Sequence, residues 1–169
     1  DFAVIDSIPD LSKTESAPQV PKLDTVEAFA GRYVFRIEGL PDRYAEAVGT
    51  AMDSAADGVL FHCAAGKDRT GMVAAALLEA LGVPRVVIAA DYGLSAEGMQ
   101  RKIAAEARDP LPGDTRYELL PDLVKAPSAG VMTRFLELMD ERHGGLLALL
   151  QANGLDDGRI RAFRSLMLG

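Results

Sequence analysis

The chain of 169 residues is poor in the groups that cross-link small proteins or hold structural metals. It contains one cysteine, two histidines and no tryptophan. A single cysteine excludes a disulfide within the chain, and with only two histidines beside it a structural zinc site of the Cys/His type is not expected. A lone thiol fits a reducing compartment, in which it stays reactive. We therefore expect neither a metal nor another cofactor.

Two further absences limit the partners. No run of about 18 apolar residues is present, so no transmembrane segment is predicted. Positive charge is also scarce, because 25 Asp and Glu outweigh 18 Lys and Arg and leave a net charge of -7. This balance argues against nucleic-acid binding, since basic surfaces supply most of the non-specific affinity for phosphate backbones. An anionic substrate would have to be attracted locally, and the oligomeric state is left open.

The first residues, Asp1-Phe2-Ala3-Val4-Ile5-Asp6, have neither an initiator methionine nor the character of a signal peptide. We therefore predict a processed or partial chain. The protein is expected either in the cytoplasm or outside the cell. If it is exported, no signal peptide is visible in this sequence. The length predicts a single domain over residues 1–169 with a core of its own.

Apolar residues make up 49% of the chain, and their spacing predicts both strands and helices. Residues 2–5 are predicted to form a short strand, and Val59-Leu60-Phe61 a buried parallel strand after the break at Asp57-Gly58. Helical patterns cover most of the remainder. The pattern predicts an α/β fold with a helix-rich C-terminal half, and the expected helices lie at 40–56, 70–81, 84–92, 95–107, 131–143, 146–150 and 160–167.

Residues 95–130 have a different composition, with a polar helix pattern followed by several prolines. Their polarity and their position after the helix at 70–81 predict a lid over the site described next. A plain surface excursion is the alternative.

The most informative segment is His62-Cys63-Ala64-Ala65-Gly66-Lys67-Asp68-Arg69-Thr70-Gly71. It places the only cysteine six residues before an arginine, in a loop between an apolar run and a helical pattern. Such a loop directs several backbone N–H groups into one concavity, and the start of the helix adds partial positive charge. The segment therefore predicts a binding site for a phosphoryl group.

The same field stabilises a thiolate at Cys63 and brings its pKa from about 8.5 into a range of roughly 3.5–7.5. Arg69 would bind two phosphate oxygens as a planar fork, and Thr70 would donate its hydroxyl to the departing sulfur. Attack by Cys63 would give a phosphocysteine, which water then hydrolyses. A buried, inert Cys63 is the alternative, but a core strand does not normally run into Lys67, Asp68 and Arg69. His62 is predicted to shape the loop and tune the thiol, with core packing as its alternative.

The segment resembles the signature of the protein tyrosine phosphatase superfamily. Its Gly-Lys-Asp-Arg version is similar to that of atypical bacterial tyrosine and dual-specificity phosphatases, some of which also act on phosphoinositides. The similarity continues through Ala90-Asp91-Tyr92 and residues 140–144, and so covers roughly residues 40–169. The resemblance implies a parallel-sheet core flanked by helices, of which the N-terminal strands are missing here or supplied by another chain or fragment.

The resemblance also implies roles for single residues. Cys63 would be the nucleophile, Arg69 the phosphate-binding arginine and Thr70 the aid to thiolate departure. Lys67 would add charge for acidic head groups. In this subgroup the general acid is an aspartate of the loop, here Asp68, which we favour over Asp10 in Ile8-Pro9-Asp10; a loop brace is the alternative role of Asp68. The backbone N–H groups would come from Ala64, Ala65, Gly66, Lys67 and Asp68.

These observations together predict a cysteine-dependent phosphatase. Its substrate would be phosphotyrosine, with phosphoserine, phosphothreonine or phosphoinositides as further candidates. An inactive phosphate-binding pseudophosphatase is the first alternative, although such proteins usually lose one of the residues Cys63, Asp68, Arg69 and Thr70. A sulfur-transfer enzyme is the second, and the spacing from Cys63 to Arg69 argues against it.

Overall fold

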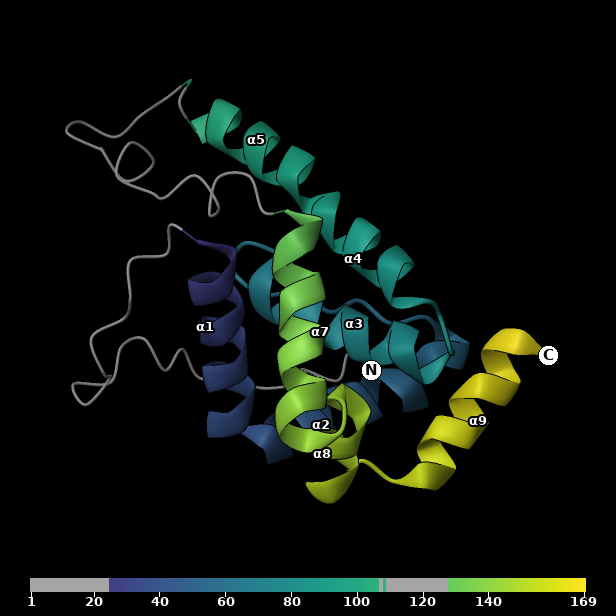
Figure 1. Cartoon of the computed structure of the whole chain (residues 1–169). Helices are drawn as coiled ribbons and strands as arrows, with labels where there is room; N and C mark the ends of the chain where they lie inside the picture. The colour runs from purple at the N-terminus through teal and green to yellow at the C-terminus, as the bar shows by residue number, and fades with distance from the viewer. Residues whose placement is uncertain (1–24, 107, 109–127) are drawn as a thin grey trace.

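The computed structural model describes residues 25–106, 108 and 128–169, and within these ranges every regular element is a helix. Figure 1 shows the helices packed into one body, with α9 at its edge. The elements are α1 (Val26–Gly39), α2 (Pro41–Asp53), the 3₁₀ turn η2 (Ala55–Asp57), α3 (Asp68–Ala80), α4 (Arg85–Gly93), α5 (Ser95–Glu106), α7 (Ala129–His143), α8 (Leu146–Ala152) and α9 (Asp157–Leu168).

The prediction of a parallel-sheet core is wrong, because no strand occurs in the described part of the chain. Val59 and Leu60, expected in a buried strand, are exposed, Leu60 by 82%. Phe61 alone packs against the core. A strand needs a neighbouring strand to satisfy its backbone N–H and C=O groups, and none of the described residues offers one. The strand predicted at residues 2–5 lies outside the described residues.

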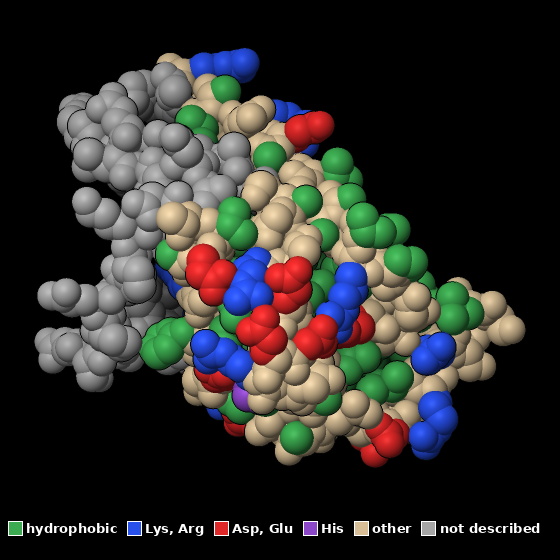
Figure 2. Space-filling model, in the orientation of Figure 1, with side chains coloured by type: hydrophobic (Ala, Val, Ile, Leu, Met, Phe, Trp, Pro, Cys, Tyr) green, Lys and Arg blue, Asp and Glu red, His purple; other side chains and the backbone are tan. Residues whose placement is uncertain are grey.

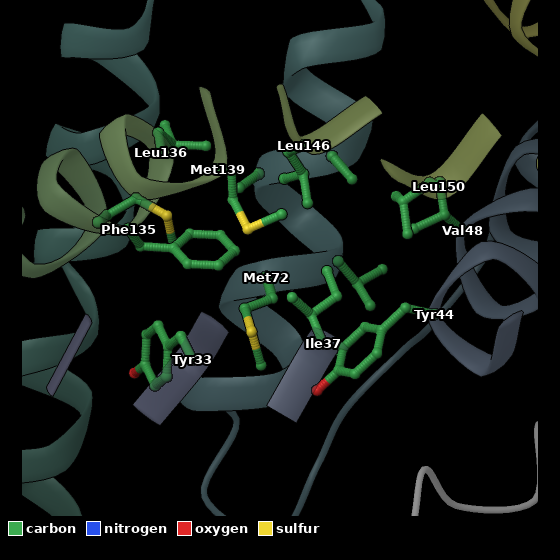
Figure 3. Packing of buried hydrophobic residues seen from close by; sticks show 14 of the residues in the cluster. Tyr33, Ile37, Tyr44, Val48, Met72, Phe135, Leu136, Met139, Leu146 and Leu150 are labelled. Atoms are coloured by element: carbon green, nitrogen blue, oxygen red, sulfur yellow. The ribbon is translucent and has the colours of Figure 1, made fainter. Parts of the chain in front are cut away.

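The core lies where α7 packs between α1 and α4 and also contacts α8 (Figure 1). Helix α3 fills the space between α2, α4 and α8, and α9 packs on α2. Figure 3 shows buried side chains from these helices meeting in one cluster. Among them are Tyr33 and Ile37 of α1, Met72 of α3, and Phe135 and Met139 of α7. The core is therefore built by helix-on-helix packing of apolar faces.

Helix α1 was not among the predicted elements. It begins after Thr25, whose side chain accepts a hydrogen bond from the N–H of Ala28 at 3.1 Å. That bond satisfies one of the free donors at the start of the helix. The buried residues Phe29, Tyr33 and Ile37 follow at intervals of four and line one face. This face packs on α7, so α1 is an integral part of the core.

The remaining helical predictions agree with the structure within a few residues at their ends. Helix α3 begins at Asp68 rather than Thr70, so that two of the polar residues of the loop belong to its first turn. The predicted lid at 95–130 lies partly outside the described residues, which include only α5 and a few residues at each side of the gap. None of the described helices combines the length and apolarity needed to cross a membrane.

Figure 2 shows one face of the molecule, on which acidic and basic side chains alternate over α7. Hydrophobic side chains border this charged area on the side of α4. Val86 and Val87 of α4 belong to the large hydrophobic residues that are exposed.

Candidate active site

The loop that follows Phe61 leads directly into α3. Gly66 adopts a φ of +64°, in the left-handed region that favours glycine. The chain then turns so that Lys67 precedes the helix and Asp68 opens it. The first intrahelical bond runs from the N–H of Gly71 to the carbonyl of Lys67 at 2.7 Å. The free N–H groups of this first turn are available to an acceptor placed before the helix.

The acceptor in that position is the sulfur of Cys63. Burial raises the pKa of the Cys63 thiol, but the donor groups near the sulfur outweigh burial; these are the hydroxyl and the N–H of Thr70 and the N–H groups of Lys67 and Ala65. The net result lowers the pKa from 9.0 to about 7. At neutral pH a large fraction of Cys63 is therefore a thiolate, the form that attacks as a nucleophile.

Thr70 contributes to this stabilisation from inside the helix. Its hydroxyl oxygen is buried and makes no hydrogen bond of ordinary geometry with the described residues. The Cys63 thiolate, which this hydroxyl stabilises, is thus the acceptor toward which it can turn. A hydroxyl in this place can donate a hydrogen bond to a thiolate.

Arg69 is half-buried in the first turn of α3. Both Arg69 and Cys63 lie close enough to the Tyr44 phenol to act on it electrostatically. Cys63 and Arg69, six residues apart in the chain, therefore both lie in the neighbourhood of this phenol. His62, by contrast, is exposed, and its Nδ1 lies 3.3 Å from the carbonyl oxygen of Cys63. The ring does not pack into the core, which removes that alternative.

The side chain of Lys67 is buried, which the sequence did not indicate. Its side chain is 2% exposed, and its ammonium lies 2.8 Å from Oδ1 of Asp68 and 4.8 Å from the centre of the Phe29 ring. The ammonium therefore faces the interior rather than solvent. A cation over an aromatic ring and beside a carboxylate is stabilised by both groups. What Lys67 presents to the loop is its backbone N–H.

Asp68 is held from two sides. Oδ1 accepts a hydrogen bond from the Tyr33 hydroxyl at 2.6 Å and another from Lys67 at 2.8 Å. Burial raises the pKa of Asp68, but the charge and hydrogen bond of Lys67, the hydrogen bond of Tyr33 and the charge of Arg36 outweigh burial, so the pKa of this carboxyl is lower than usual. Asp68 is a carboxylate at neutral pH.

Tyr33 and Tyr92 complete this arrangement, and the sequence had given no role to either hydroxyl. The two hydroxyl oxygens lie 2.6 Å apart. Burial raises the pKa of both phenols, so each keeps its proton. A buried tyrosine hydroxyl normally has a hydrogen-bond partner, and this rule is the signal that points to polar partners for such residues. It does not say which partners, because Tyr33 and Asp68 are 35 residues apart.

The other predicted positions are exposed or outside the described residues. Ala64, Ala65 and Gly66 are exposed at the tip of the loop, where a ligand can approach their backbone. Asp10, the alternative general acid, lies outside the described residues. Within the described residues, no group of three or more His, Cys, Asp or Glu side chains is arranged to hold a metal ion.

The chain is similar to known proteins over most of its length. The model of the tyrosine phosphatase family matches residues 7–169. The chain belongs to the tyrosine phosphatase family. Among its relatives, the triple specificity protein phosphatase PtpB of Mycobacterium tuberculosis is 34% identical over 122 residues, which cover 66% of this chain and 44% of that protein. A tyrosine-protein phosphatase of Nostoc commune is 33% identical over 113 residues, 63% of this chain and 37% of the relative. This family member thus spans less than half the length of either curated relative.

Proposed function

We propose that the chain is a cysteine-dependent phosphatase that hydrolyses phosphotyrosine in proteins. The observation that carries the proposal is the Cys63 thiol, whose pKa is lowered to about 7 by donors from its own loop. A loop that stabilises a thiolate through several N–H groups also suits the equatorial oxygens of a phosphoryl group. Membership of the tyrosine phosphatase family supports the same reaction.

The reaction proceeds in two steps. The Cys63 thiolate attacks phosphorus, the bond from phosphorus to the tyrosine oxygen breaks, and a phosphocysteine forms. Arg69 binds the transferring group through its guanidinium. In the second step water attacks phosphorus, inorganic phosphate leaves, and the sulfur departs as a thiolate that the Thr70 hydroxyl stabilises.

We also propose that Asp68 gives the proton to the leaving oxygen. In the free protein Lys67 and Tyr33 keep Asp68 ionised. A phosphate dianion that enters the loop adds negative charge beside the carboxylate and raises its pKa, which favours uptake of a proton with the substrate. General acid catalysis of this kind is typically worth about 10²–10⁴ in rate.

We infer the range of substrates beyond phosphotyrosine from the exposure of the loop. The loop residues Ala64, Ala65 and Gly66 are exposed, which supports access for the shorter phosphoserine and phosphothreonine side chains as well. The name of the mycobacterial relative, a triple specificity protein phosphatase, is consistent with a broad range. The buried ammonium of Lys67 offers no charge to a lipid head group, so we rank phosphoinositides below phosphopeptides.

The decisive experiment compares phosphate release by the wild type and by Cys63→Ser. The substrates are a phosphotyrosine peptide, a phosphoserine peptide and phosphatidylinositol phosphates. We expect turnover of the phosphotyrosine peptide by the wild type and none by the variant, with unchanged helical circular dichroism. A wild type that binds the peptide without releasing phosphate would instead be a phosphate-binding pseudophosphatase.

The role of Asp68 is tested separately with aryl phosphates. Asp68→Asn is expected to slow phenyl phosphate, which has a poor leaving group, about 100-fold more than p-nitrophenyl phosphate. Equal losses on both substrates would assign Asp68 to bracing the loop and leave the proton donor elsewhere.

A further inference from the structure

Lys67 connects the hydrophobic interior with the nucleophile. Its side chain is buried against Asp68 and the Phe29 ring, while its backbone N–H is one of the donors that act on the Cys63 sulfur. The direction of this N–H therefore depends on how firmly the side chain of Lys67 is held. Among the described residues, the ion pair with Asp68 and the contact with the Phe29 ring hold this side chain in place.

The hydrogen bonds around Asp68 have a fixed direction. An ionised carboxylate can only accept, so the single proton of Tyr33 goes to Asp68. The Tyr33 oxygen then accepts from Tyr92. The chain of donors runs from Tyr92 on α4 through Tyr33 on α1 to Asp68 at the start of α3. It ties three helices to the residue that opens the loop helix.

Aromatic packing keeps Tyr33 in place independently of its hydroxyl. The ring makes edge-on contacts with Phe29, Tyr92 and Phe135, with ring centres 5.5, 6.2 and 5.9 Å away. A phenylalanine at position 33 retains these contacts and loses only the polar ones. The hydroxyl can therefore be removed without removing the packing.

We propose that Tyr33 and Tyr92 are positioning residues of the phosphatase site. Their hydroxyls anchor Asp68, and through Asp68 and Lys67 they keep the backbone N–H groups of the loop directed at Cys63. This inference deepens the proposed function and rests on it for its catalytic meaning. Both tyrosines act on the reaction through Asp68.

Several groups surround Asp68, and the test must leave their charges unchanged. Lys67 lies beside it, Tyr33 and Arg36 face it from α1, Tyr92 from α4 and Tyr44 from α2. Replacing any of these tyrosines by phenylalanine changes no charge, because burial raises the pKa of all three phenols. Tyr44 serves as the matched control, since its hydroxyl is buried but has no hydrogen-bond partner among the described residues.

The experiment measures the pKa of Cys63 from the rate of alkylation by iodoacetamide as a function of pH. Cys63 is the only cysteine, so the rate reports this one thiol. Tyr33→Phe is expected to raise the pKa of Cys63 by about one unit, because weakened N–H donors stabilise the thiolate less. Tyr92→Phe, which removes only the outer bond, should raise it less, and Tyr44→Phe should leave it unchanged.

A Cys63 pKa that is the same in the wild type and in both Tyr33→Phe and Tyr92→Phe would overturn the inference. An equal rise in all three variants would do so too, because it would indicate general loosening of the fold. If Tyr33→Phe does not fold, the difference between Tyr92→Phe and Tyr44→Phe decides. Measuring the pKa of Cys63 by alkylation needs no substrate. A wild type that lacks phosphatase activity would therefore refute the proposed function, while the measured pKa values would still test the role of the two tyrosines.

Discussion

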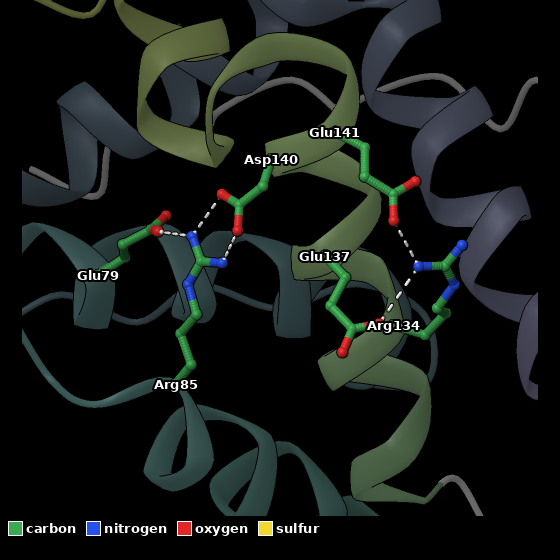
Figure 4. A network of polar contacts seen from close by, with 6 residues as sticks. All are labelled: Glu79, Arg85, Arg134, Glu137, Asp140 and Glu141. Carbon is green, nitrogen blue, oxygen red and sulfur yellow. Dashed lines mark hydrogen bonds and ion pairs between the residues drawn. The ribbon is translucent and has the colours of Figure 1, made fainter.

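The ion pair of Lys67 with Asp68 and the network around Arg134 both join a cation to carboxylates, but they lie in opposite environments. Lys67 is 2% exposed and has one carboxylate partner, to which Tyr33 also donates. Arg134 lies on the outer face of α7, where Glu27, Glu137 and Glu141 surround it at 2.6 to 3.2 Å, each more than half exposed. Figure 4 shows Arg134 with Glu137 and Glu141, beside a second network in which Arg85 of α4 contacts Asp140 and Glu79.

Surface and buried ion pairs contribute differently to the stability of the protein. Surface pairs are screened by water and salt and contribute little to stability. These surface pairs link α7 to α1 and to α4, but they do not fix the positions of these helices precisely. A buried pair is costly to desolvate and tolerates no missing partner. The buried pair of Lys67 and Asp68 lies next to Cys63. Its fixed geometry therefore also fixes the backbone of the loop that holds this cysteine.

The largest effect is expected from breaking the buried pair. Lys67→Met keeps the length of the side chain but leaves the Asp68 carboxylate without its cation. The free energy of unfolding should fall by about 3 kcal/mol, as measured by urea denaturation. The double variant Lys67→Met/Asp68→Asn should recover a large part of the loss, since no charge is then left uncompensated. A loss no greater than that of Arg134→Met would contradict this account.

A smaller effect is expected from Gly71→Ala. A Cβ atom at Gly71 would lie 2.8 Å from Cδ2 of the Tyr92 ring, so the ring that carries the outer hydroxyl must move. Overpacking of this kind typically costs about 1–3 kcal/mol in a urea titration. The matched control is Gly31→Ala in α1, where nothing lies within 4 Å of the added atom. There the higher helix propensity of alanine should stabilise the protein, so the two substitutions have opposite signs.

The smallest effect is expected from Arg134→Met on the surface. The variant should unfold at a urea concentration close to that of the wild type. Whatever difference remains at low salt should disappear in about 1 M NaCl, where the Debye length is roughly 3 Å. The deficit of Lys67→Met should persist under the same conditions. If Arg134→Met lowered the free energy of unfolding equally at low and high salt, the surface network would stabilise the protein more than surface ion pairs normally do.

The sequence was sufficient to predict elements with a clear period and a local signal. The apolar spacing of Met132, Phe135 and Met139 predicted α7. The segment from Cys63 to Thr70 predicted a loop that leads into a helix, and the structure shows such a loop at this place. Both depend on residues that are neighbours in the chain, and for this reason a pattern can reveal them.

The errors and omissions come from interactions across the chain. A three-residue apolar run such as Val59-Leu60-Phe61 fits a strand or an extended segment equally well, and only a pairing partner decides between them. Burial of Lys67 contradicts the usual exposure of lysine and depends on Phe29, a residue of another helix. The apolar period of α1 was present in Phe29, Tyr33 and Ile37, and a count of matches to the helical template would have found it.

The packing of α1 on α7 has a consequence for the synthesis of the protein. Glu27 of α1 and its ion-pair partner Arg134 of α7 are 107 residues apart in the chain. At ordinary translation rates of about 5–20 residues per second, α1 leaves the ribosome roughly 5–20 s before the helix that covers it. During this interval its apolar face, with Tyr33 at the centre, is without its main partner. The nascent chain therefore presents an uncovered apolar face until α7 emerges, and the contact of the Tyr33 ring with Phe135 forms only then.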